Sequence, residues 1–187
     1  MNAALKADFL TVAEYLDGEE HSDLRHEYIG GAVYAMAGTT REHHRIAGNL
    51  FAALHAHLGS GPCQVAMSDL KLHVAVSASD AFYYPDVMVT CDPRDTDSLC
   101  NQFPKLIVEV LSESTERIDR IEKFNAYLKL ESLEEYVLIA QDRAEVVIYR
   151  RNIQWKPEIA VGLETSLRLA SVNFTMPLAM LYRGVSV

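Results

Sequence analysis

The chain has 187 residues, of which 49% are apolar and 23% charged, as expected for one soluble globular domain with a sizeable core. Its net charge of −9 argues against a generic DNA-coating protein but leaves a nuclease open, because the local charge of a cleft matters more than the sum. We find no apolar run of membrane-spanning length and no signal-peptide pattern at the N-terminus, so we expect a cytoplasmic protein.

The cysteines predict neither a metal site nor a disulfide. Cys63, Cys91 and Cys100 make an odd set without the spacing of zinc ligands. We expect all three to be reduced and to pack as small apolar side chains.

The first third of the chain predicts a helix, a hairpin and a second, longer helix. Thr11 to Glu14 is a capping-box pattern that opens a short helix through Leu16. Gly30-Gly31 suits the two-residue turn of a β-hairpin that spans Arg25 to Met36. The spacing of apolar residues then predicts a helix over Arg41–Leu58.

The middle of the chain predicts strands and one further helix. The order helix, three strands, helix, strand is typical of a mixed sheet flanked by helices, which we assign to a single domain over residues 1–187. The first two strand segments can also be one strand with a bend. The segments are the strands Gln64–Met67, Leu70–Val76, Phe82–Val89 and Lys105–Ser112 and the helix Thr115–Leu130.

The last third has a weaker pattern. We expect a strand pair at Glu135–Ala140 and Glu145–Arg151, one strand near Ser166–Ala170, and a short closing helix that Pro177 opens.

Two carboxylates stand out because each lies in a strand of apolar residues. Asp86 lies in the third predicted strand and Glu109 in the fourth. Unpaired charges in such places are costly, and a shared Mg²⁺ would account for both, since hard cations bind carboxylate oxygens. Pro85 cannot donate to a ladder and marks an edge or bulge that would re-aim Asp86. The pair predicts a metal-dependent phosphodiesterase site.

The same residues carry a family resemblance. Tyr84-Pro85-Asp86 followed by Ile107-Val108-Glu109-Val110-Leu111-Ser112 resembles the PD-(D/E)XK nuclease superfamily, whose core order the chain shares. Over nearly its whole length the chain is similar to a bacterial family of restriction endonucleases of unknown specificity. The resemblance implies a restriction-endonuclease-like α/β fold with an N-terminal β-hairpin, Mg²⁺ as cofactor with Mn²⁺ as a substitute, and DNA as substrate. Its further elements are His26-Glu27-Tyr28-Ile29-Gly30-Gly31, Met36-Ala37-Gly38, His43, Ser114-Thr115, Asp119, Lys123 and Tyr127.

The chain departs from the superfamily motif at one position. The motif has a lysine two residues after the acid, on the same face of the strand, and here that residue is Leu111. Lys123 is the first candidate for the missing cation, since some superfamily members carry this lysine on the following helix. Asp119, Lys123 and Tyr127 lie about one turn apart and share a helix stripe. Lys71, in a preceding strand, is the second candidate.

We therefore expect Asp86, Glu109 and Lys123 as catalytic residues and Asp86, Glu109 and Glu27 as metal ligands. His43, Lys71, Asp119 and Tyr127 are candidates for the surrounding shell. Structural interpretations stand beside these. They are a turn or cap residue for Asp86, a salt-bridged core acid for Glu109, a solvated strand acid for Glu27, the polar edge of a helix for His43, and a surface i,i+4 pair for Asp119 and Lys123.

Three functions compete at this point. The first is a Mg²⁺-dependent endonuclease, for which cutting both strands would favour a homodimer by analogy. The second is an inactive nuclease-fold module that binds nucleic acid or a protein partner, which Leu111 and the charge of −9 support. The third is a two-carboxylate glycosidase, which the single tryptophan supports little.

Overall fold

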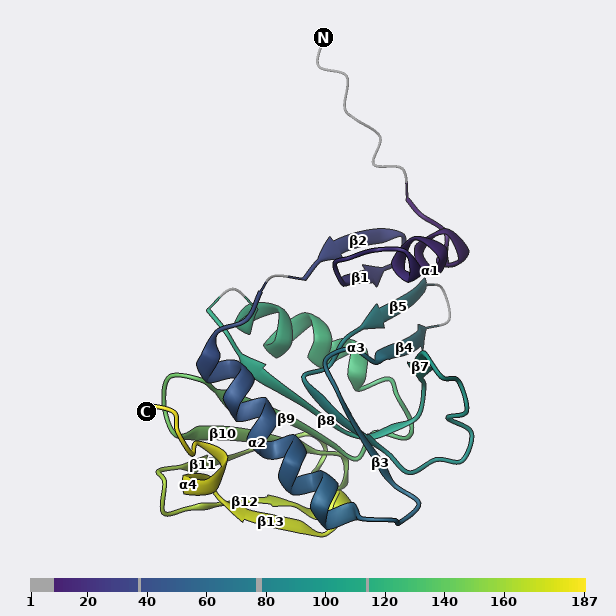
Figure 1. Ribbon diagram of the computed structural model, residues 1–187. Coiled ribbons are helices and arrows are strands. Elements are labelled where there is room, and N and C mark those ends of the chain that lie inside the picture. The colour runs from purple at the N-terminus through teal and green to yellow at the C-terminus, as the bar shows by residue number, and fades with distance from the viewer. Residues whose placement is uncertain (1–8, 37, 77–78, 114) are drawn as a thin grey trace.

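The computed structural model describes residues 9–36, 38–76, 79–113 and 115–187, whose strands form a six-stranded, a five-stranded and a two-stranded sheet (Figure 1). Residues 1–8, on which the expectation about a signal peptide rests, lie outside the described residues. So do Ala37 and Ser114, which belong to the family resemblance. Among the described residues, no helix combines the length and the apolar character that crossing a membrane requires.

The six-stranded sheet forms the centre of the molecule. Its order is β11-β10-β9-β8-β6-β3, and β8 pairs in parallel with β9 and antiparallel with β6, so the sheet is mixed as predicted. The strands are β3 Gln64–Met67, β6 Val87–Thr90, β8 Pro104–Leu111, β9 Glu135–Ala140, β10 Glu145–Arg150 and β11 Pro157–Val161.

Different helices and strands pack against the two faces of this sheet. Leu106, Val108 and Val110 of β8 pack with helix α2 (Arg41–Leu58), whose bounds match the prediction. On the same face lie the pair β12–β13 and helix α4, visible below α2 in Figure 1. Ile107 and Leu111 face the other way, toward the segment η1–α3. Period 2 places Glu109 on that second face. The remaining covering elements are β12 Ser166–Leu169, β13 Phe174–Pro177, α4 Leu178–Leu181, η1 Ile118–Lys123 and α3 Phe124–Tyr127.

The five-stranded sheet carries the N-terminal hairpin. Its order is β2-β1-β5-β4-β7, and Gly30 and Gly31 have the positive φ values, 56° and 100°, that the predicted hairpin turn requires. Helix α1 packs Tyr15 against Tyr28 and Phe82 on one face. The elements are α1 Val12–Glu20, β1 His26–Ile29, β2 Ala32–Ala35, β4 Lys71–Val76, β5 Ser79–Tyr83 and β7 Cys100–Asn101.

Helix α1 begins with the predicted cap but ends later than predicted. The capping box between Thr11 and Glu14 is present. The helix continues past Leu16 to Glu20, and its last turn contains the buried Glu19. Glu19 accepts hydrogen bonds from the His26 backbone N–H and the Tyr84 hydroxyl. These tertiary contacts stabilise a turn that the polar sequence alone does not favour.

The continuous strand predicted over Phe82–Val89 is wrong. The segment divides into β5 and β6, which belong to different sheets. Tyr84-Pro85-Asp86 lies outside both strands, and Pro85 has no N–H to offer a ladder there. Asp86 therefore lies at the junction of the two large sheets, immediately before β6.

The helix predicted after Glu109 contains an unexpected π-helical segment. Residues Ile118–Lys123 (η1) form a π-helix that continues into α3. Ile121 is 52% exposed, whereas Asp119 and Lys123 are buried. A π-helix has more residues per turn than an α-helix, and in η1 Asp119 and Lys123 rather than Ile121 face the sheet.

The C-terminal predictions hold for the strands β9, β10 and β12 and for α4, while β11 and β13 were not predicted. Strand β11 begins at Pro157 and lies at the edge of the sheet, where proline is tolerated, so its sequence carried a weak strand signal. The 3₁₀ turns η2 (Arg151–Ile153) and η3 (Ala170–Val172) complete the fold.

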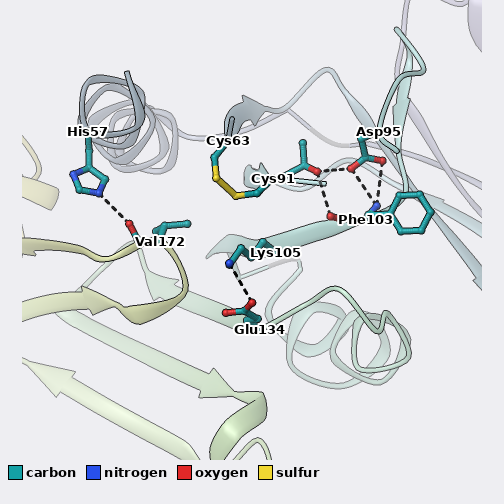
Figure 2. The surroundings of a disulfide bond; sticks show 9 residues. His57, Cys63, Cys91, Asp95, Phe103, Lys105, Glu134 and Val172 are labelled. Atoms are coloured by element: carbon teal, nitrogen blue, oxygen red, sulfur yellow. Dashed lines mark hydrogen bonds and ion pairs between the residues drawn. A yellow bond between two sulfur atoms is a disulfide. The ribbon is translucent and has the colours of Figure 1, made fainter. Parts of the chain in front are cut away.

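The expectation of three reduced cysteines is wrong. Cys63 and Cys91 form a disulfide, shown in Figure 2, and Cys100 is free and buried. The antiparallel register of β3 and β6 pairs Gln64 with Thr90, so the next pair along the two strands is Cys63 and Cys91. The contact depends on strand register across 28 residues of sequence and could not be read from cysteine spacing.

Candidate active site

Asp86 and Glu109 lie side by side where β6 begins, next to the central strand β8 of the six-stranded sheet. The β6–β8 register pairs Val87 with Val108, and its continuation places Asp86 opposite Glu109. The Asp86 N–H donates to Glu109 Oε2 over 3.2 Å, and the Val110 N–H donates to Asp86 Oδ2 over 2.7 Å. The two acids therefore converge, and each accepts a hydrogen bond from a backbone N–H of the segment that faces it.

Lys123 reaches the same site from η1. Its Nζ lies 3.3 Å from Glu109 Oε1, 2.9 Å from Glu27 Oε1 and 3.4 Å from Asp119 Oδ1. The lysine side chain is only 8% exposed. The π-helical geometry of η1 brings Asp119 and Lys123, four residues apart, onto the face that meets the sheet. The other candidate cation, Lys71, instead lies over the Tyr84 ring, 5.8 Å from its centroid.

Aromatic and imidazole groups complete the site. The Tyr127 hydroxyl donates to Glu109 Oε1 over 3.0 Å, and the Tyr83 ring lies 5.8 Å from Lys123 Nζ. His43, in the first turn of α2, places Nε2 3.1 Å from Asp86 Oδ2. Its Nδ1 is buried and has no hydrogen-bond partner among the described residues. The elements β1, α2, β8 and η1 thus all contribute to one site.

The site holds several carboxyl groups around one ammonium group. Burial raises the pKa of Glu109 well above its usual value, and repulsion from Asp119, Asp86 and Glu27 adds to the rise although Lys123 opposes it. Burial also raises the pKa of Asp119, again against the effect of Lys123. For Lys123, burial lowers the pKa, but Glu109, Glu27 and Asp119 together raise it well above the ordinary value, so the amine stays charged.

The carboxylates do not form a ready-made cage for an ion. In the described part of the chain, no three His, Cys, Asp or Glu side chains are grouped as the ligands of a metal would be. Glu27 lies against Lys123, and its role as a third metal ligand stays a prediction. Leu111, at the motif position of the lysine, is a buried core residue.

Residues 12–179 match the Uma2 family, which is described as a putative restriction endonuclease family. The chain belongs to the Uma2 family. Two proteins of Synechocystis, both described as uncharacterized, are similar to it. One is 36% identical over 184 residues, which cover 95% of this chain and 93% of that protein. The other is 36% identical over 151 residues, which cover 78% of this chain and 84% of that protein.

A solved structure confirms the fold of this Uma2 protein. The crystal structure of a putative nuclease of family DUF820 from Anabaena variabilis superimposes with a TM-score of 0.75 over 92% of this chain and 97% of that one. The two chains are only 16% identical, so the likeness concerns the fold. The predicted resemblance to restriction endonucleases is confirmed at the level of family and fold.

Two features of the Uma2 site could not be predicted from the sequence. Tyr83 is a buried core residue, and period 2 along β5 and β1 also puts it on the same sheet face as Glu27. The contact between Glu27 and Lys123 joins positions 96 residues apart (123 − 27) and has no local signal.

Proposed function

We propose that this protein is a metal-dependent endonuclease that hydrolyses DNA phosphodiester bonds at the Asp86–Glu109 pair. The observation that carries the proposal is the meeting of these two acids with the buried ammonium of Lys123, whose Nζ lies 3.3 Å from Glu109 Oε1. Two carboxylates and a cation are the groups that the superfamily motif requires, and membership in the Uma2 family supports their assignment.

The residues suit a divalent cation. With Glu27, Asp86, Glu109 and Asp119 ionised against Lys123, the site carries four negative charges and one positive charge. Mg²⁺ typically binds proteins through one or two carboxylates and completes its shell with water and phosphate oxygens. Asp86 and Glu109 would hold it, and the bound ion would activate water and stabilise charge on the phosphate.

The protein's own groups would orient the two acids and neutralise charge on the phosphate. Two backbone N–H groups and the Tyr127 hydroxyl fix the orientation of the acids, which limits the reorganisation needed during reaction. Lys123 supplies a positive charge next to Glu109 in a site that largely excludes water, where charge interactions are strong. We assign to Lys123 the task of the motif lysine, which is to orient water or to neutralise charge that develops on the phosphate.

The test combines cleavage with metal binding. Purified protein with Mg²⁺ or Mn²⁺ is expected to nick or cut plasmid DNA, and Asp86→Asn and Lys123→Met are each expected to abolish cleavage. Mn²⁺ alone is expected to raise the melting temperature of the wild type by mass action. The double variant Asp86→Asn/Glu109→Gln is expected to lose this shift. An undiminished shift in that variant would place the ion elsewhere.

Glu134→Gln is the matched control, because it removes the partly exposed ion pair of 3.2 Å between Lys105 and Glu134, which does not belong to the site. Figure 2 shows this pair. It is expected to keep both cleavage and the shift with Mn²⁺. Cleavage that persists in Asp86→Asn would indicate a contaminating nuclease.

The alternative function is a nuclease-fold module that binds without cutting. The observation that favours it is Leu111, which fills the core at the position of the motif lysine. A wild-type protein that binds DNA with the salt dependence of phosphate contacts, yet never cuts it with Mg²⁺ or Mn²⁺, would establish this alternative. Light scattering of the free protein tests the predicted homodimer, and cell fractionation tests the predicted cytoplasmic location.

A further inference from the structure

We infer that Glu27 is a positioning residue, which the N-terminal hairpin supplies to hold the Lys123 ammonium in the site, rather than a ligand of the metal. The inference rests on the proposed function for its consequence in catalysis, but its structural part can be tested without any cleavage. It assigns a role in the site to the hairpin β1–β2, which precedes the helix that begins the superfamily core order.

The contacts of Glu27 point to Lys123. Glu27 Oε1 lies 2.9 Å from Lys123 Nζ, which is shorter than the lysine contacts to Glu109 and Asp119. The Glu27 side chain is 14% exposed, and Oε1 itself is buried without a hydrogen bond of regular geometry among the described residues. The ion pair is therefore the interaction that accounts for burying this carboxylate.

The geometry explains why a second acid is needed. Lys123 and Asp119 are four residues apart on η1 and can pair on their own element. Such a pair alone would hold the amine along the helix surface. Glu27 approaches from β1 of the five-stranded sheet, and Glu109 lies on β8 of the six-stranded sheet. The ammonium is therefore held between β1, β8 and η1. A lysine side chain has many rotamers, and this arrangement restricts them before substrate arrives.

The hairpin is anchored for this task. Tyr28, next to Glu27, is buried among Tyr15 and Phe82 on the opposite sheet face. The His26 backbone N–H donates to the buried Glu19 carboxylate over 2.9 Å. The residues on both sides of Glu27 are thus fixed, so strand alternation directs its side chain toward Lys123.

The experiment compares Glu27→Gln and Glu27→Asp with Asp86→Asn as the metal-ligand variant and Glu134→Gln as the matched surface control. Three quantities are measured in each protein: the melting-temperature shift with Mn²⁺ alone, the fraction of Lys123 modified in a brief reductive methylation read by peptide mass spectrometry, and kcat and KM for DNA cleavage. Circular dichroism confirms that each variant is folded.

For Glu27→Gln we expect the Mn²⁺ shift of the wild type, a several-fold rise in Lys123 methylation, and a kcat lowered about 10–100-fold with little change in KM, as is typical when a supporting partner is lost. Glu27→Asp keeps the charge and is expected to restore part of the protection and of kcat. Glu134→Gln is expected to leave all three at wild-type values.

Two results would overturn the inference. Loss of the Mn²⁺ shift in Glu27→Gln, as in Asp86→Asn, would make Glu27 a metal ligand. Unchanged Lys123 methylation in Glu27→Gln would show that the lysine is held without it. If the wild type cuts no DNA, the proposed function fails, while the methylation of Lys123 still decides whether Glu27 positions it.

Discussion

Replacing Lys123 by methionine removes the cation from a buried group of acids and tests the electrostatic account of the site. The ammonium lies within 3.4 Å of three carboxylates and its side chain is 8% exposed. Removing one partner of a buried ion pair costs about 3–5 kcal/mol of unfolding free energy. We expect a loss in this range for Lys123→Met at pH 7 without metal. The loss does not scale with the number of partners, because a carboxylate left alone can take up a proton.

The assay is urea unfolding, with thermal melting as a second measurement. For a chain of this length, a loss of 3–5 kcal/mol corresponds to a melting temperature lower by roughly 6–20 °C. The matched control is Lys105→Met, which removes a partly exposed ion pair to Glu134. Exposed pairs contribute about 0–1 kcal/mol, so the control is expected to unfold almost as the wild type does.

The dependence on pH gives a second, independent check. The pKa values of Glu109 and Asp119 are already raised, chiefly by burial, and loss of Lys123 raises them further. A raised pKa means that the folded state binds more protons than the unfolded state, so stability falls as pH rises above the ordinary carboxylate range. The deficit of Lys123→Met is therefore expected to grow between pH 5 and pH 8. A loss below about 1 kcal/mol, or a deficit independent of pH, would refute the reasoning.

Two further predictions concern features outside the site. Cys63→Ser/Cys91→Ser is expected to unfold about 3–4 kcal/mol more easily than the oxidised wild type, since the 28-residue separation sets the chain entropy that the bridge removes; equal stability under oxidising conditions would contradict this. Arg150→Met leaves the buried Glu135 carboxylate without the guanidinium 2.6 Å away and is expected to cost about 3–5 kcal/mol in urea unfolding. The control is Arg143→Met, which removes exposed ion pairs. A loss of about 3–5 kcal/mol in this control as well would show that burial does not set the cost of losing the arginine.

The sequence by itself determined the elements with strong local signals. The helix Arg41–Leu58 and the hairpin around Gly30-Gly31 follow from apolar spacing and from the φ angles that glycine permits. The acids Asp86 and Glu109 could be singled out because a carboxylate in an apolar segment needs a partner. That these two acids lie opposite each other depends on the register of β6 and β8.

The tertiary structure decided which distant groups meet. Asp86 lies between two sheets rather than within a strand, because β5 and β6 pair with different neighbours. The π-helical turn of η1 places the buried Asp119 and Lys123 against the sheet, and the meeting of Lys123 with Glu27 depends on the packing of η1 against the five-stranded sheet. The bond between Cys63 and Cys91 likewise depends on the register of β3 and β6. Spacing along the chain predicts contacts within an element or its neighbour, whereas these contacts are set by how separate elements pack.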